Sequence, residues 1–135
     1  MRAFALAALM ALTSCDALQR EGREQNSTFT TFLTRQDVRA RAETWLGEQA
    51  QYDVVRSESI FVQGEKRRPR TVGPGTQIDV QSVSLETVAE GTRVEVNSQT
   101  FLVAGNVRRE QADQLSPEAN ADHDALVQAL MARPF

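Results

Sequence analysis

Residues 92–103, TRVEVNSQTFLV, decide the fold class of this chain. Small and apolar side chains alternate strictly with charged and amide ones: Val94, Val96, Ser98, Thr100 and Leu102 against Arg93, Glu95, Asn97 and Gln99. A period of two residues places successive side chains on opposite faces of a β-strand. The pattern therefore predicts a strand with one buried and one solvated face, which is typical of an antiparallel sheet.

Further strands are predicted on the N-terminal side of this one. Residues 76–88 precede it, and the loop Ala89-Glu90-Gly91 joins the two into a hairpin in which Gly91 can adopt a positive φ. Residues 52–57 and 59–65 are rich in strand-forming side chains and predict two strands or one long bent strand. The tripeptide Gly73-Pro74-Gly75 predicts a turn after them.

The apolar pattern changes phase within residues 76–88. Two apolar side chains share one alternation and the next two share the other: Ile78 and Val80, then Val83 and Leu85. An extra residue in a strand produces such a change, so we predict a bulge or bend near Gln81 and Ser82.

Two helices flank the predicted strands. The first spans residues 35–50, with Thr34 as N-cap and Asp37 three residues later. Its apolar residues fall on one face, and Trp45 is the expected main anchor: Val38, Ala42, Trp45, Leu46 and Ala50. The second begins at Ser116-Pro117-Glu118, with serine as N-cap and proline in the first helical position. Its apolar-facing set is His123, Leu126, Val127, Leu130 and Met131.

The predicted fold class is α+β: an antiparallel sheet of three to four strands with two helices packed on one face, in the order α-β-β-(β)-β-α. This layout resembles the helix-grip repeats of an outer-membrane assembly lipoprotein. It is also similar to short uncharacterised lipoproteins built from a helix, a β-meander and a final helix. The resemblance is one of layout, so it assigns no functional residue.

The N-terminus carries a targeting signal. Arg2 is followed by nine apolar residues, 4–12, a run too short to span a bilayer but typical of a signal peptide. Leu12-Thr13-Ser14-Cys15 resembles the bacterial lipobox. The resemblance implies that Cys15 receives a diacylglyceryl group, that the signal is cut before it, and that the new amine is acylated with a fatty acid such as palmitate. Several acyl chains would give stable anchoring.

An ordinary cleaved signal with Cys15 near the cut by chance is the alternative. Asp16 resembles the signal that retains lipoproteins in the inner membrane of some Gram-negative bacteria, so the inner membrane is favoured over the outer. The domain itself would face the periplasm or the exterior. The expected division is therefore residues 1–14 as a lipoprotein signal peptide, 15–33 as a lipid-anchored N-terminus and tether, and 34–135 as a single α+β domain. Within the tether, residues 28–33 contain Phe29, Phe32 and Leu33 and could pack onto the domain or form a short edge strand.

Composition limits the classes of function. At 135 residues the chain has room for one domain, and its single cysteine forms no internal disulfide. A net charge of −3 argues against nucleic acid as a partner, because a general binder needs a surplus of basic residues.

No catalytic set, metal site or cofactor is predicted. His123 is the single histidine and lies between Asp122 and Asp124. A metal or acid–base site built from these three is disfavoured, because neighbouring residues of a helix point about 100° apart. The preferred interpretation of His123 is a partly exposed residue at the edge of the apolar stripe. Residues 1–135 contain no Gly-x-Ser-x-Gly nucleophile motif.

The most concentrated charge lies at residues 66–70, which we expect to form a loop between strands. Its four cations are Lys66, Arg67, Arg68 and Arg70. One interpretation is contact with anionic lipid headgroups, worth about 1 kcal/mol for each cation. The other is a solvated loop that discourages edge-to-edge strand pairing.

These features predict a membrane-anchored, non-enzymatic envelope lipoprotein. It would act as a binding, assembly or scaffolding module for an unknown envelope protein or ligand, held to the lipid bilayer through Cys15. The alternative is a carrier of a lipid or other apolar ligand, with a pocket between the helices and the sheet. An unfilled apolar pocket under Trp45 would favour the carrier.

Overall fold

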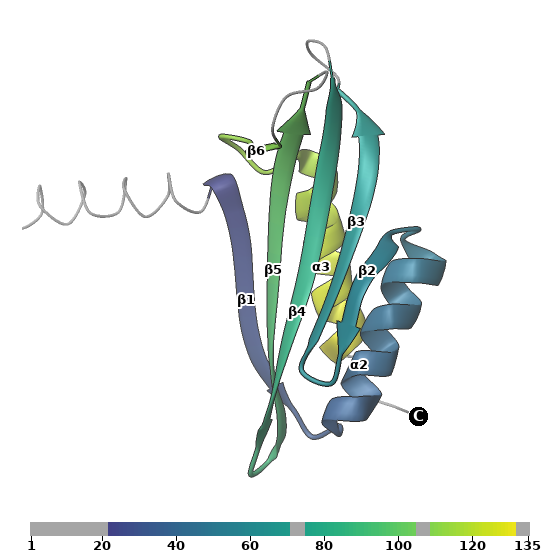
Figure 1. Cartoon of the computed structure of the whole chain (residues 1–135). Coiled ribbons are helices and arrows are strands. Elements are labelled where there is room, and N and C mark those ends of the chain that lie inside the picture. The colour runs from purple at the N-terminus through teal and green to yellow at the C-terminus, as the bar shows by residue number, and fades with distance from the viewer. Residues whose placement is uncertain (1–21, 71–74, 105–108, 132–135) are drawn as a thin grey trace, which may run out of the picture.

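The computed structural model describes residues 22–70, 75–104 and 109–131. They form a six-stranded antiparallel sheet with two helices packed on one of its faces (Figure 1). In chain order the elements are β1 Glu24–Thr31, α2 Arg35–Thr44, the π-helical turn η1 Trp45–Gln49, β2 Asp53–Glu58, β3 Phe61–Pro69, β4 Thr76–Val88, β5 Gly91–Val103, β6 Glu110–Gln111 and α3 Pro117–Met131.

The strands follow the order β1-β5-β4-β3-β2, and β6 pairs with β5. The class α+β is confirmed, but the prediction of three to four strands is wrong. The β4–β5 hairpin has the predicted connection, in which Val88 pairs with Gly91 and Gly91 has φ +142°. The predicted turn at Gly73 and Pro74 lies outside the described residues.

The predicted number of strands leaves out β1 and β6. β1, EQNSTFTT, pairs with β5 over its whole length, whereas residues 15–33 were expected to form a tether in which a short edge strand was open for residues 28–33 alone. An edge strand has a neighbour on one side and a solvated outer face, so polar residues are tolerated along it. β6 has two residues, too few to show any alternation.

The bulge predicted in β4 is absent. β4 pairs residue for residue with β5 from Thr76 to Val88, and with β3 through Gln81 and Ser82. The apolar pattern changes phase because the apolar side chains change face: Ile78 and Val80 lie on the outer face, whereas Asp79 and Gln81 face the helices. The bulge of the sheet lies instead in β2, between Val54 and Arg56.

Arg109 covers the outer face of β4. Its guanidinium stacks 4.7 Å from the ring centre of Phe101 on β5, and its Nη2 donates to Glu65 Oε1 on β3 at 2.6 Å. Phe101 pairs with Ile78, and Glu65 pairs with Val80. The guanidinium therefore lies above β4 and shields these two apolar side chains from water.

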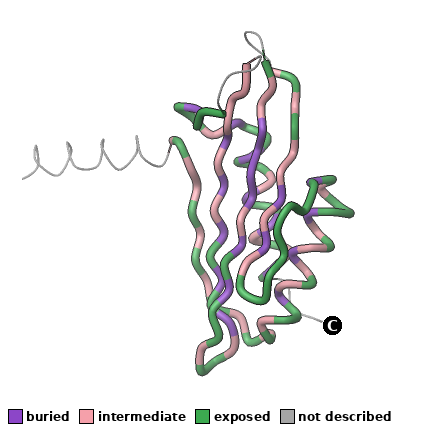
Figure 2. Tube along the Cα trace, viewed as in Figure 1, coloured by how far each residue is buried: buried purple, intermediate pink, exposed green. Residues whose placement is uncertain are grey.

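The core lies between the sheet and the helices, and along β5 buried residues alternate with exposed or partly exposed ones (Figure 2). Fully buried aliphatic side chains from both layers form one cluster: Val38, Ala42, Leu46, Val62, Val83, Val94, Val96, Leu126 and Leu130. Each large aliphatic side chain contributes roughly 1.5–3 kcal/mol by leaving water. Leu46, not Trp45, is the main anchor of the first helix, since Trp45 is only partly buried at the margin of the cluster.

Both predicted helix starts are confirmed. The backbone N–H of Asp37 donates to Thr34 Oγ1 at 3.2 Å, and that of Ala119 donates to Ser116 Oγ at 3.0 Å. Such caps satisfy backbone donors that have no partner within the helix. They fix the first turns of α2 and α3 at opposite ends of the sheet (Figure 1).

Candidate functional site

A group of polar side chains, most of them buried and two partly exposed, lies between α3 and the part of the sheet where that helix begins. We call it the buried polar network: Tyr52, Arg68, Asp79, Gln81, Ser98, Thr100, Ser116, Asp122 and His123. Its strand residues occupy the helix-facing positions of β3, β4 and β5, which farther along the same strands are occupied by the valines of the core. The sheet therefore has an apolar half and a polar half on the same face.

Asp79 is the centre of one end of this network. Its carboxylate is fully buried and accepts from Arg68 Nε at 2.8 Å, Thr100 Oγ1 at 3.0 Å and Ser116 Oγ at 2.9 Å. Burial lowers the pKa of Arg68, but its interactions with Asp79 and Tyr52 together outweigh this effect and the net shift is upward. The Arg68 guanidinium thus stays charged, and the bonds to Asp79 join β3, β4, β5 and the start of α3.

Asp122 and Tyr52 connect this end to the centre of the network. Asp122 Oδ2 accepts from Arg68 Nη2 at 2.9 Å and from the Tyr52 hydroxyl at 2.7 Å. Gln81 Nε2 donates to Ala119 O at 3.1 Å and lies 3.5 Å from the same hydroxyl. Burial, followed by the bond to Asp122, raises the pKa of Tyr52, so the phenol stays protonated and donates.

His123 closes the other end of the network and is fully buried, so the prediction of a partly exposed residue is wrong. Its Nδ1 lies 2.7 Å from Ser98 Oγ and its Nε2 lies 2.7 Å from Ser27 Oγ. Ser98 donates its hydroxyl proton to Gln81 Oε1, so it accepts from Nδ1–H. This assigns the neutral tautomer protonated on Nδ1, with Ser27 donating to Nε2.

The network is suited to holding elements together rather than to catalysis. The Ser27–His123 distance is that of a nucleophile and its base, but a base of that kind is oriented by a third group that stabilises its cation. Here that third position is occupied by the Ser98 hydroxyl. Among the described residues no group of three histidine, cysteine, aspartate or glutamate side chains could hold a metal ion.

We expect the folded state to lose stability as the pH falls from about 7.5 to about 5. Burial lowers the pKa of His123, and the smaller effect of Asp124 opposes it. The unfolded chain therefore binds the proton more readily in this range, and stability rises with pH. Urea unfolding at several pH values checks this expectation, and the slope should be shallower in His123→Gln.

Equal slopes for the two proteins would contradict the assignment. Glu24 does not interfere in this range, because its bond to Gln99 lowers the pKa of its carboxyl and confines its contribution to more acidic pH.

The basic run at residues 66–70 does not form a loop, because Lys66, Arg67 and Arg68 lie within β3. Lys66 Nζ donates to Ala50 O at 2.7 Å, and Arg68 belongs to the buried polar network. Arg67 points to the opposite, outer face, and Arg70 follows the strand. The period of two thus separates the four cations, and they do not present one basic surface.

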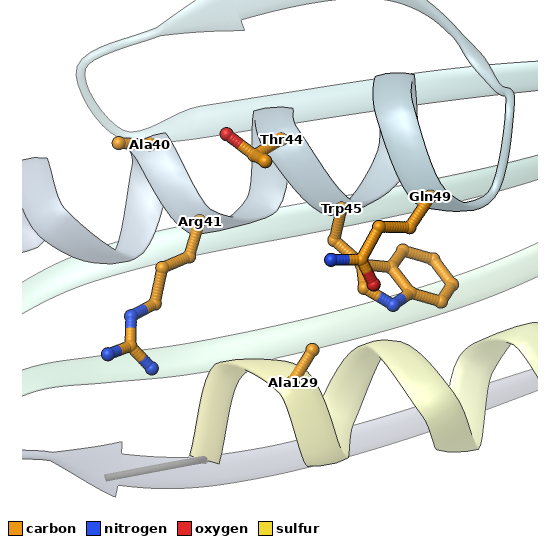
Figure 3. A pocket seen from close by; sticks show the side chains of 6 residues that line it. All are labelled: Ala40, Arg41, Thr44, Trp45, Gln49 and Ala129. Carbon is orange, nitrogen blue, oxygen red and sulfur yellow. The ribbon is translucent and has the colours of Figure 1, made fainter. Parts of the chain in front are cut away.

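A groove of about 320 Å³ lies between the two helices (Figure 3). Its lining comes from helices alone: Ala40, Arg41, Thr44, Trp45, Gln49 and Ala129. Arg41, Trp45 and Gln49 project toward α3, where Ala129 faces them. Because no sheet residue lines it, the groove is a surface feature and does not open into the helix–sheet interface.

A larger hollow of about 490 Å³ lies at the end of the molecule where α2 begins. We call it the distal pocket, because it lies at the far end of β1 from Glu24 (Figure 1). Three segments line it, the β1–α2 connection, the β2–β3 turn and the β4–β5 hairpin: Phe32, Thr34, Arg35, Gln36, Arg39, Ser59, Thr87, Val88, Ala89 and Gly91.

No family model matches the sequence, and no curated protein matches it either. Among solved structures, the chain is similar to the crystal structure of a DUF4468 family protein from Bacteroides ovatus. The TM-score is 0.50 at 8% sequence identity, and the match covers 84% of this chain and 88% of that one. At this identity the similarity concerns the fold alone.

Cys15, the predicted lipidation site, lies outside the described residues. Within the described part of the chain, no helix has both the length and the apolar character needed to cross a bilayer. The buried polar network and the distal pocket were both missed from sequence. A signal for the network existed: Asp79 and Gln81 alternate with the apolar Ile78 and Val80, and Ser98 and Thr100 share the predicted buried face of the next strand with Val94 and Val96.

Proposed function

We propose that this protein is a membrane-anchored, non-enzymatic module of the cell envelope that binds a partner through its surface. The lipobox-like residues ending in Cys15 support the anchor. β1 begins only nine residues after Cys15, so a fully extended connection reaches at most about 30 Å. The domain would therefore stay close to the bilayer that holds the acyl chains.

The closed helix–sheet interface is the main observation in favour of binding at the surface. Val38, Leu46, Val96 and Leu126 have no exposed surface, so no water-sized void lies beside them. The polar half of the interface is occupied by mutual hydrogen bonds. Binding at the surface is therefore favoured over a carrier that encloses an apolar ligand between helices and sheet.

Replacing Cys15 by serine tests the anchor. In the producing bacterium, the wild-type protein should fractionate with membranes and incorporate labelled palmitate, because acyl chains supply the membrane affinity. The variant should lose the label and at least about 90% of the membrane-bound protein, since one removed attachment site removes every acyl chain. A variant that is processed at the same site and stays equally membrane-bound would contradict the lipoprotein proposal.

Partner binding is tested by crosslinking intact cells and purifying the protein from solubilised membranes. We expect one stoichiometric envelope protein to accompany it. Recovery of a monomer that carries a bound lipid would instead support the carrier.

A further inference from the structure

Phe32 is an exposed aromatic residue that the backbone holds in place. Its side chain is 65% exposed at the rim of the distal pocket. On both sides the chain is fixed: Leu33 N donates to Thr31 Oγ1 at 3.3 Å, and Thr92 Oγ1 donates to Leu33 O at 2.8 Å. Gly91 packs directly against the Phe32 backbone. Because the backbone is already fixed, only the two side-chain torsions of Phe32 remain to be ordered when a partner covers it, and exposed aromatic residues of this kind are typical interface anchors.

The charge of the distal pocket is opposite to that of the whole chain. Its lining contains Arg35 and Arg39 and no acidic residue, whereas the chain has a net charge of −3. Arg39 Nη1 forms an ion pair with Glu43 Oε1 at 3.6 Å. Arg35 has no ion-pair partner among the residues that the structure describes. The first turn of α2 begins here too, and a helix N-terminus favours a negative ligand. The pocket is therefore suited to carboxylates.

The position of the pocket favours a protein over the bilayer as its occupant. β1 runs from Glu24 toward Phe32 and places them roughly 25 Å apart. If Cys15 is anchored, the chain leaves the membrane near Glu24 and the pocket lies at the opposite end of the domain (Figure 1). Ile60, which is 52% exposed in the β2–β3 turn beside Ser59, adds apolar surface there.

We propose that the distal pocket binds an acidic segment of an envelope protein, with carboxylates on Arg35 and Arg39 and an apolar side chain against Phe32. The choice of an envelope protein rests on the proposed function. The chemistry of the pocket does not, because it depends only on the residues that line it.

A set of fluorescent heptapeptides tests this binding with the full-length protein in detergent. Each peptide consists of Asp and Glu residues with one Phe or Leu, and the position of this apolar residue differs from peptide to peptide. A matched set has Lys in place of every Asp and Glu. We expect the acidic peptides to bind, the basic ones to fail, and affinity to fall as salt is raised.

Charge reversal at Arg35 separates binding from folding. Arg35→Glu should weaken peptide binding by roughly tenfold or more, because attraction becomes repulsion. The same substitution adds an acid to the first turn of α2, where it does not destabilise the helix. Arg67→Glu, on the exposed outer face of β3, is the matched control and should bind as the wild type does. Phe32→Ala should weaken binding, while Val55→Ala, at another exposed apolar residue, should not.

Absence of Arg35-dependent binding throughout the peptide set would overturn the proposal. So would Arg35-dependent binding to phosphatidylglycerol vesicles without any binding to the peptides, because the occupant would then be a lipid surface. The peptide assay is independent of Cys15. The fractionation of Cys15→Ser and the peptide-binding assay are therefore independent. Either proposal can be contradicted while the other is supported.

Discussion

Replacing Asp79 by alanine should lower the free energy of unfolding by roughly 3–5 kcal/mol, because it removes one partner of a buried ion pair. The substitution leaves Arg68 with Asp122 alone and removes the acceptor of two buried hydroxyl groups, those of Thr100 and Ser116. Polar groups left unpaired in the interior cost more than the original bonds contributed. Urea unfolding followed by the fluorescence of Trp45, the single tryptophan, measures the loss.

Two further variants show whether the loss comes from burial. Glu86→Ala removes a carboxylate that pairs with Arg93 at the surface, and it should cost no more than about 1 kcal/mol. The double variant Arg68→Met with Asp79→Leu should be less destabilised than Asp79→Ala, because it leaves no buried charge without a partner. If Asp79→Ala and Glu86→Ala proved equally stable, Asp79 would not hold the structural role assigned to it.

Gly91→Ala should destabilise the protein by about 3 kcal/mol, through backbone strain and a steric clash together. Gly91 has φ +142°, a conformation that residues with a side chain rarely adopt. A methyl group there would come within 2.7 Å of the Phe32 Cα, and backbone cannot move aside as a flexible side chain can. Thermal unfolding measured by circular dichroism should show a clearly lowered Tm.

Gly47→Ala is the control for this substitution. Gly47 lies in the π-helical turn, and the nearest atom to an added methyl group there is 4.0 Å away. Alanine is favoured over glycine inside a helix by about 1 kcal/mol, so the expected effect is neutral or stabilising. A Gly91→Ala protein as stable as the Gly47→Ala protein would show that the contact between the hairpin and the β1–α2 connection is dispensable.

The strands with regular alternation and the capped helices could be predicted from sequence. Residues 92–103 alternate without interruption, and Thr34 and Ser116 are strong N-caps, so local chemistry alone specifies these elements. β1 could not be predicted in the same way. Its pairing with β5 is a long-range contact, and an edge strand needs little apolar surface of its own.

The interior polar residues illustrate why the site was missed. Apolar periodicity assumes that the buried face is apolar, and Asp79 and Gln81 break that assumption. Their burial is tolerated because partners from other elements satisfy them: Arg68 and Ser116 bond to Asp79 across 11 and 37 positions, and the Ala119 carbonyl bonds to Gln81 across 38. For the same reason His123 was expected to be partly exposed at the edge of the apolar stripe. The distal pocket combines three connections that are remote in sequence, so no local pattern marks it.

The pairing of β1 with β5 also sets an order of events during synthesis. Glu24 pairs with Gln99, and Ser27 bonds to His123, which is separated from it by 96 positions. At about 5–20 residues per second, β1 emerges several seconds before its partner strand exists. β1 is thus synthesised before the other described strands but is among the last to pair with its neighbour. Nearly all of the residues that the structure describes must therefore be synthesised before β1 can pair and the domain can close.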